Sequence, residues 1–358
     1  MMQVLKLNIV LSLCGIILLC NSPLSAQDQV VDEWWNTAFW SGPADNPAAK
    51  NLPLIQVEGN AFVNPSGEKV LFRGLAISDP DKLEKQNRWT REHFEKIKEM
   101  GATLVRIPIH PVAWRERTAA GYIELLDQAV QWCTELEMYI IMDWHSIGNL
   151  KMELFQNPMY DTTQKETYSF WQRMASHYSG HNTVAFYELF NEPTHFRGML
   201  GSMSWAEWKK INEDIIRLIR SFDTETIPLV AGFDWAYDLT HLNFDPLDSE
   251  GIGYVTHPYP WKRNKPWPSR WDENFGFAAS KWPIMASELG FNQEALLQEG
   301  KEDYGEIIIP YLEERGISWV AWVYDPEWHP QMLKSWDTYE LTPCGEFFRK
   351  AMQGELDK

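Results

Sequence analysis

Short apolar runs alternate along the chain with longer segments in which apolar residues recur every three to four positions. Continuous apolar runs such as Leu104–Ile109 and Tyr139–Met142 are typical of parallel strands that are buried on both faces. The segments between them have the period of amphipathic helices. Eight strands are predicted in this way, over residues 70–75, 102–108, 138–143, 184–190, 228–232, 252–257, 283–287 and 317–323.

Capping residues support the helices between these strands. Thr90 precedes one amphipathic segment and Gly101 ends it, which is typical of helix boundaries. Residues 204–207, Ser-Trp-Ala-Glu, have the spacing of a capping box and predict a helix that continues to about Ser221. The other predicted helices cover residues 122–136, 162–178 and 302–315.

Strands alternating with helices predict an α/β fold with a parallel sheet, and eight such units close most simply into a (β/α)₈ TIM barrel. An open, doubly wound sheet is the alternative. It is disfavoured because no glycine-rich phosphate loop follows an early strand. Ahead of the barrel, Ile55–Phe72 predicts a short β-hairpin that turns at Asn64–Gly67.

The first residues have the pattern of an export signal. A single early lysine precedes a short apolar core, and Leu24-Ser-Ala26 is an acceptable cleavage site, so residues 1–26 are predicted to be a signal peptide. The apolar core is too short to span a membrane. A lipoprotein signal ending at Cys20 is the alternative, disfavoured because Leu19 is bulky where a small residue is expected. The protein is therefore expected to be secreted, either extracellular or periplasmic.

The rest of the chain is expected to contain a polar N-terminal segment, residues 27–53, followed by a single barrel domain, residues 54–358. The predicted mature chain keeps two cysteines, Cys133 and Cys344, which lie far apart in helical patterns. Two such cysteines are no disulfide framework, and neither is expected to act in catalysis or metal binding.

The composition of the chain indicates which classes of molecule it can bind. The chain has 50 acidic and 32 basic residues, a formal net charge of −18, which repels nucleic acid and anionic lipid but not a neutral polymer. Tryptophan is abundant, with 19 residues. Rings on polar, proline-rich segments suit either core packing or the apolar faces of sugars, and five lie in such segments: Trp114, Trp261, Trp267, Trp271 and Trp328. Trp144, within a predicted strand end, has the same two interpretations.

Five predicted strands each carry an ionisable side chain at or near the carboxyl end, where TIM barrels place their sites. These side chains are Arg106, His145, Glu192, His257 and Glu288. Taken alone, a histidine or glutamate at a strand end usually has a structural role. Their coincidence at one end of one barrel instead predicts a functional site.

Two of the five are carboxylates on strands four and seven, which lie across the barrel from each other. Glycoside hydrolysis needs one protonated carboxyl group to donate to the leaving oxygen and one ionised group opposite it, roles that Glu192 and Glu288 could share. Neither a metal nor another cofactor is predicted, because His145 and His257 come from different strands without His-x₃-His spacing and without an accompanying cysteine.

Two segments resemble the site of a known family. Phe186-Tyr-Glu-Leu-Phe-Asn-Glu-Pro193 and Met285-Ala-Ser-Glu288 are similar to the strand-four and strand-seven signatures of glycoside hydrolase family 5, the large cellulase family of clan A. The resemblance extends from about Ile55 to Met352. It implies that Glu192 is the acid/base, that Glu288 is the nucleophile and that Asn191 binds the 2-hydroxyl of the sugar being cleaved. Five other residues match the remaining family positions: Arg106, His145, His257, Tyr259 and Trp322.

The chemistry of these residue types agrees with the implied roles. Arg106 can keep Glu288 ionised and oriented, and Tyr259 can donate a hydrogen bond to it. His257 can bond either the acid/base or the substrate, with its tautomer left open. Trp322 offers a stacking floor for the sugar that is cleaved.

The resemblance implies a retaining endo-β-1,4-glucanase that acts on β-glucan, expected to be a monomer. A mannanase, a xyloglucanase or a mixed-linkage glucanase would use the same pair and remains an alternative. A catalytically inactive sugar-binding barrel is disfavoured because both glutamates are present. The chain departs from the family at Arg73–Ile77 and at Ser146–Asn149; the second segment is expected to be a loop beside the substrate that affects preference.

Overall fold

The computed structural model describes residues 51–195 and 200–356, all of which belong to one compact unit, residues 38–358. The predicted signal peptide, the Cys20 alternative and nearly all of the polar segment 27–53 lie outside the described residues. The eight predicted strands form a closed parallel barrel, which confirms the (β/α)₈ fold and excludes the open sheet. In chain order they are β3 (Arg73–Ala76), β4 (Leu104–Ile109), β5 (Tyr139–Trp144), β8 (Val184–Glu188), β10 (Ile227–Ala231), β11 (Gly253–Val255), β12 (Ile284–Leu289) and β13 (Ser318–Ala321).

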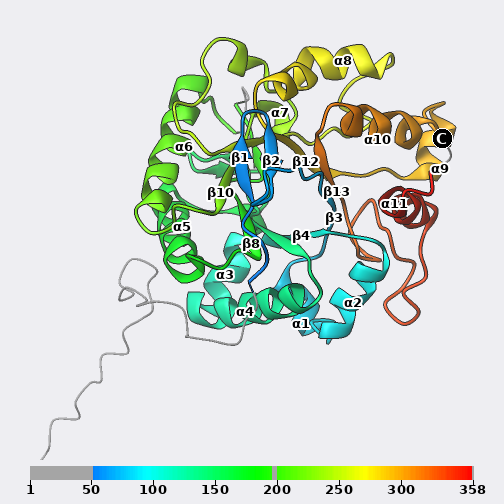
Figure 1. The fold of residues 1–358 in the computed structure, drawn as a ribbon, viewed down its shortest axis with the longest axis horizontal. Helices are drawn as coiled ribbons and strands as arrows, with labels where there is room; N and C mark the ends of the chain where they lie inside the picture. The colour runs from blue at the N-terminus through cyan, green and yellow to red at the C-terminus, as the bar shows by residue number, and fades with distance from the viewer. Residues whose placement is uncertain (1–50, 196–199, 357–358) are drawn as a thin grey trace, which may run out of the picture. The chain divides into compact units, whose positions relative to one another are not determined.

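Helices surround this barrel (Figure 1). The Thr90 side chain caps its helix by accepting from His93 N, and the capping box between Ser204 and Glu207 forms as predicted. Among the described residues, no helix is both long and apolar enough to cross a membrane. The helices are α1 (Pro80–Lys85), α2 (Arg91–Glu99), α3 (Pro111–Arg117), α4 (Ala119–Glu135), α5 (Gln164–Tyr178), α6 (Trp205–Arg220), α7 (Phe233–Ala236), α8 (Trp267–Asn274), α9 (Gln293–Gln298), α10 (Tyr304–Glu314) and α11 (Pro343–Gln353).

The predicted hairpin forms, but its main turn lies earlier than expected. Strand β1 (Gln56–Glu58) pairs antiparallel with β2 (Ala61–Val63), and Gly59 takes the left-handed φ of +58° that this tight turn needs. The predicted turn at Asn64–Gly67 also exists, closed by a hydrogen bond of 2.9 Å from Gly67 N to Asn64 O. It makes a second, smaller reversal of the chain. The segments on either side of this turn are paired only by one isolated β-bridge.

The hairpin closes the amino-terminal end of the barrel. Phe62 on β2 packs edge to face against Phe72 and Phe186, with ring centroids 6.3 and 4.9 Å apart. These rings belong to a buried cluster inside the barrel that continues through Leu104 and Ile141. Because this end is filled with apolar side chains, polar side chains can gather only at the carboxyl ends of the strands.

Candidate active site

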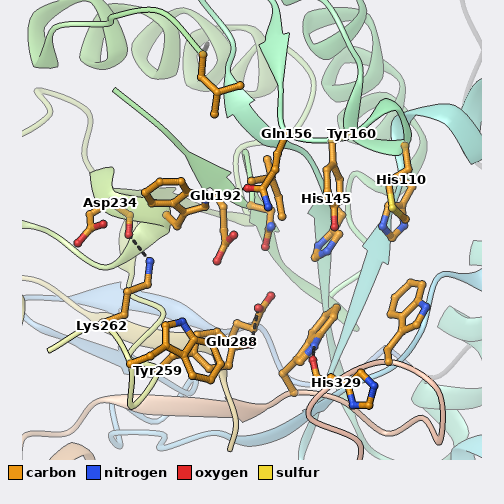
Figure 2. Close-up of a pocket in the computed structure, with 18 of the residues that line it drawn as sticks. His110, His145, Gln156, Tyr160, Glu192, Asp234, Tyr259, Lys262, Glu288 and His329 are labelled. Atoms are coloured by element: carbon orange, nitrogen blue, oxygen red, sulfur yellow. Dashed lines mark hydrogen bonds between the residues drawn. The ribbon is translucent and has the colours of Figure 1, made fainter. Parts of the chain in front are cut away.

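A cleft of about 950 Å³ opens over the carboxyl ends of the barrel strands. Six of the eight predicted site residues line it: His145, Asn191, Glu192, Tyr259, Glu288 and Trp322. Figure 2 shows Glu192 and Glu288 near its centre. The other two, Arg106 and His257, are fully buried beneath it. The structure therefore brings all eight predicted residues together.

Glu192 is fixed by a small sheet beside the barrel. Its two-residue strand β9 (Glu192–Pro193) runs parallel to β6 (Ile147–Asn149), which also pairs with β7 (Leu154–Phe155). Gly148 permits the pairing of β6 with β7, because a Cβ there would lie 2.5 Å from a backbone oxygen of β7. The segment Ser146–Asn149, expected to be a loop beside the substrate, is thus mainly a strand that holds the Glu192 backbone, although Ile147 also lines the cleft.

A bulge in β12 aims two consecutive side chains at the site. The register against β13 shifts by one residue between Ala286 and Leu289, so β12 holds one extra residue there. In a regular strand, consecutive side chains point to opposite faces. Here both side chains make hydrogen bonds with buried polar residues. Ser287 donates to Glu188, and Glu288 accepts from Arg106.

Both oxygens of Glu288 accept hydrogen bonds. Arg106 Nη1 lies 3.0 Å from Oε2, and the Tyr259 hydroxyl donates to Oε1 at 2.6 Å. Burial, followed by the charge of Glu288, raises the pKa of Tyr259 well above its usual range, so the phenol keeps its proton. Burial also raises the pKa of Glu288, while the positive charges of His257 and Arg106 oppose that shift. Two donors thus favour the ionised form of Glu288 in a buried position.

Arg106 holds two further buried carboxylates, which sequence reasoning missed. Its guanidinium binds Glu188 through two hydrogen bonds of 2.8 and 3.0 Å, and Nη2 lies 3.0 Å from Asp143. Burial disfavours the charge on Glu188, but Arg106 outweighs it and holds the pKa of Glu188 at about 2. A signal was present: a glutamate inside the buried apolar run of β8 requires a partner just as an arginine does.

Asn191 is bound on one side only. Its Oδ1 accepts a hydrogen bond of 2.6 Å from Arg106 Nη2. Its buried Nδ2 has no hydrogen-bond partner among the described residues, although it belongs to a side chain that lines the cleft. Because a buried amide donor without a partner is costly, this group is suited to a ligand hydroxyl.

The hydrogen bonds of His257 show which atom its Nε2 hydrogen faces. Ser287 Oγ donates to Glu188 at 2.9 Å and so accepts from His257 Nε2 at 3.1 Å. Nε2 therefore carries hydrogen, and Nδ1 faces Glu192 Oε1 at 3.0 Å. One proton then lies between Nδ1 and Glu192. Burial opposes the charge on His257, but Glu288, Glu188 and Glu192 together raise its pKa to about 9.

Aromatic rings form the floor of one end of the cleft. His145 stacks on Trp322 with centroids 5.3 Å apart, and Trp322 stacks on Trp328 at 5.9 Å. His145 Nδ1 bonds Asp143 at 2.6 Å, and burial lowers the pKa of His145 well below its usual range, so the ring stays neutral. This floor offers flat apolar surface for sugar rings.

The predicted tryptophans divide between cleft and core. Trp261 and Trp328 line the cleft. The interpretation as sugar contacts is wrong for Trp114, Trp267 and Trp271, which are at most 2% exposed and pack in the core. Trp144 is also a packing residue, stacked on Phe170 at 4.1 Å. Trp235 lines the cleft but was not predicted.

Possible metal ligands come together only within this site, as far as the described chain extends. Glu192, His257 and Glu288 offer ligand atoms within 4.8 Å of one another. However, both Glu288 oxygens already accept hydrogen bonds, one of them from a guanidinium. A cation bound there would face the positive charge of Arg106 at close range, so the donor set fits a proton-transfer pair better than a metal centre.

Comparison with known proteins identifies the family. The family model described as cellulase (glycosyl hydrolase family 5) matches residues 63–327. The chain belongs to glycosyl hydrolase family 5. An endoglucanase of Clostridium saccharobutylicum is 27% identical over 84% of this chain and 65% of its own length. Endoglucanase A of Butyrivibrio fibrisolvens is 25% identical over 75% of this chain and 59% of its own length. The chain thus spans less than two thirds of these curated relatives.

A solved structure of a β-glucanase matches this chain nearly end to end. The β-glucanase of Saccharophagus degradans superposes with a TM-score of 0.85 at 42% identity, covering 90% of this chain and 98% of that protein. The same β-glucanase has been solved in complex with cellotetraose, with a TM-score of 0.84. This similarity supports the barrel and the family membership independently of the family model.

Proposed function

We propose that this protein is a retaining endo-β-1,4-glucanase in which Glu288 is the nucleophile and Glu192 the acid/base. The separation of the two carboxylates carries the proposal: an oxygen of each lies within 4.8 Å of the other. Retaining glycosidases place these groups about 5–5.5 Å apart, whereas inverting ones need about 6.5–9.5 Å to admit a water.

Glu288 attacks the anomeric carbon while Glu192 gives its proton to the departing oxygen, so the glycosidic bond breaks as the glycosyl-enzyme ester forms. Glu192, now a carboxylate, takes a proton from water, and the water oxygen displaces Glu288. His257 supports both states of Glu192, because the proton between them can lie on either partner. Asn191 Nδ2 donates to the 2-hydroxyl of the sugar over Trp322.

The proposed substrate class is β-1,4-linked glucan. The resemblance to endoglucanases and to a β-glucanase solved with cellotetraose supports it, as does the aromatic floor of Trp322 and Trp328. We expect reducing ends to appear fastest on carboxymethylcellulose. Faster release from lichenan, glucomannan or xyloglucan would move the assignment to the mixed-linkage glucanase, mannanase or xyloglucanase alternative, respectively.

Stereochemistry tests the two-step mechanism. The first-formed product should carry the β configuration, because two displacements at one carbon restore it. Proton NMR during the first minutes of hydrolysis distinguishes this from an α product that later mutarotates. An α first product would require a single displacement and would remove Glu288 from the nucleophile role.

Export and a monomeric state belong to the same proposal. The signal-like residues 1–26 support export, with Gln27 as the first mature residue. Amino-terminal sequencing of secreted protein and its mass in solution by light scattering test these two statements. Recovery of the protein as a lipid-modified species at Cys20 would favour the lipoprotein alternative.

A further inference from the structure

We propose that Asp79 and Asp325, two buried aspartates outside the catalytic pair, are positioning residues that fix the part of the cleft on which the retained sugars rest. This inference rests on the proposed function, which decides which sugars are retained. Both aspartates are at most 3% exposed, and neither lines the cleft. They act through two rings that do line it, His110 and Trp328. These two rings meet edge to face with centroids 5.4 Å apart, and we call the pair the glycone wall.

The glycone wall lies on the side of the retained sugars. The proposed function places the sugar that is cleaved over Trp322, and Trp328 stacks on Trp322 with centroids 5.9 Å apart. Figure 2 shows His110, which contacts Trp328, at one end of the cleft, the two central glutamates in the middle and Lys262 at the other end. A sugar linked to the retained side of the cleaved unit therefore lies against the glycone wall, and the leaving group extends toward Lys262.

Asp325 fixes the backbone that carries Trp328. Its carboxylate is fully buried, and Oδ1 accepts hydrogen bonds from the backbone N–H groups of Glu327 and Trp328 at 2.5 and 2.8 Å. The other oxygen, Oδ2, accepts from the Ser78 hydroxyl and the Lys82 ammonium. One buried carboxylate thus joins the loop after β13 to the segment after β3 and to helix α1.

Lys82 extends this hold to the ring of Trp328. Its Nζ lies 4.8 Å from the centroid of the ring, within the range of a cation–π contact. The same ammonium group pairs with Asp325 and, at 3.2 Å, with Glu327. The backbone and the ring of Trp328 are therefore held by one connected set of charges, at the centre of which is Asp325.

Asp79 holds the second ring of the glycone wall in a similar way. Its Oδ2 accepts from the backbone N–H of His110 and bonds the ring Nδ1, both at 2.9 Å. Its Oδ1 accepts from Asp81 N at 2.8 Å, which caps α1. Because the same oxygen binds the backbone and the ring of His110, the orientation of the ring is fixed relative to the strand end.

The two aspartates belong to one brace. Ser78, which bonds Asp325, and Asp79, which bonds His110, are adjacent in the chain. Backbone hydrogen bonds of 3.1 and 2.9 Å connect the two residues before Ser78 to β4 and to the segment after β13. This brace directly follows Arg73–Ile77, where the chain departs from the family. A change in the brace is expected to move both rings of the glycone wall.

A double-mutant cycle tests whether Asp325 acts through Trp328. The substrate is dinitrophenyl β-cellobioside, whose two sugars occupy the cleaved position and the glycone wall while its leaving group is not a sugar. Asp325→Asn should lower kcat/KM about tenfold, because asparagine offers a donor where the carboxylate accepts and the loop that carries Trp328 shifts. In a Trp328→Ala background the same change should lower kcat/KM by less than about twofold, since the ring that Asp325 positions is gone.

Asp223 offers a matched control at the opposite end of the barrel. It is also fully buried, accepts from the backbone N–H groups two and three residues further on at 2.9 and 3.0 Å, and accepts from the Tyr187 hydroxyl at 3.1 Å. It precedes β10 and so lies at the amino-terminal end of the barrel. Asp223→Asn should lower the melting temperature about as much as Asp325→Asn does, but it should leave kcat/KM unchanged in both backgrounds.

A second cycle joins Asp79 to His110. Asp79→Asn keeps the cap of α1, because asparagine is also a good N-cap residue, so the fold should persist. It should lower kcat/KM about fivefold alone and by less than about twofold in a His110→Ala background. Ser78→Ala removes one bond to Asp325 without adding a donor, so it serves where Asp325→Asn does not fold. Its expected loss of about threefold should likewise disappear in Trp328→Ala.

The outcomes separate the inference from the proposed function. Losses that add in full to those of Trp328→Ala or His110→Ala, in either cycle, would overturn the inference. Unchanged kcat/KM in the aspartate variants, or an equal loss in Asp223→Asn, would overturn it as well. A parental protein that does not hydrolyse dinitrophenyl cellobioside would instead overturn the proposed function.

Discussion

The two central carboxylates lie within 4.8 Å of each other but in different surroundings. Glu288 accepts from Arg106 and Tyr259, two donors whose pKa values are raised in this site. Glu192 instead faces His257, whose Nδ1 lies 3.0 Å from Glu192 Oε1. The two sets of partners fit the proposed roles, in which Glu288 acts as an anion and Glu192 carries the proton.

The largest expected effect separates the two residues chemically. Glu288→Ala should lower kcat on every substrate on the order of 10⁵-fold, because no glycosyl-enzyme can form. Glu192→Ala should still react with dinitrophenyl cellobioside, whose leaving group needs no acid, and should show a burst followed by slow turnover. Azide should accelerate that turnover and yield a β-glycosyl azide. Azide rescue of Glu288→Ala to a β product, with Glu192→Ala unaffected, would mean that the roles are exchanged.

Arg106→Lys should disrupt the hydrogen bonds that surround Glu288. Lysine keeps the charge but cannot form the paired bonds to Glu188 while also reaching Glu288. The free energy of unfolding should fall by about 3 kcal/mol, because buried carboxylates lose their partner. Urea denaturation measures this change. The matched surface variant Arg91→Lys, whose partners are exposed, should be nearly neutral; an equally small effect of Arg106→Lys would show that Arg106 does not hold the network.

His257 makes stability depend on pH. Burial lowers its pKa, but the surrounding carboxylates raise it above 6.5 to about 9. The imidazolium therefore stabilises the fold fully below pH 6.5, and this contribution, about 3 kcal/mol, is lost as pH rises from 6.5 to 9. His257→Asn should flatten the dependence of unfolding free energy on pH in this window. A slope that persists in the variant would assign it to another group.

Tyr259→Phe should have the smallest effect. Burial raises the pKa of Glu288, and the hydrogen bond from Tyr259 opposes that rise. Removing the hydroxyl should therefore shift the acidic limb of the rate profile to higher pH and lower kcat about tenfold. An acidic limb that moves to lower pH would contradict the assignment of that limb to Glu288.

The barrel and the residues of its candidate site could be predicted because their signals in the sequence are local. Apolar runs located all eight strands, and polar residues at the strand ends pointed to Glu192 and Glu288. Glu188 was missed because the sequence around a buried charged residue does not show which residue pairs with it. Its partner Arg106 lies 82 positions away in sequence. Its pairing depends on barrel closure.

The positions of residues in loops were harder to predict, because they also depend on contacts with distant parts of the sequence. Trp261 and Trp267 both follow prolines in polar stretches, yet the first is 62% exposed and the second 1%. The flanking residues are alike, and only packing against distant helices separates them. Trp235 was missed because the backbone conformation that presents it depends on Lys262 and Arg263, which follow a later strand.

Trapping of the glycosyl-enzyme tests the central claim most directly. A 2-deoxy-2-fluoro cellobioside with a dinitrophenyl leaving group should inactivate the enzyme, because the fluorine slows the second step more than a good leaving group slows the first. Mass spectrometry of the digested protein should then find the label on the peptide that contains Glu288. A label on the peptide that contains Glu192, or inactivation without any covalent label, would contradict the account.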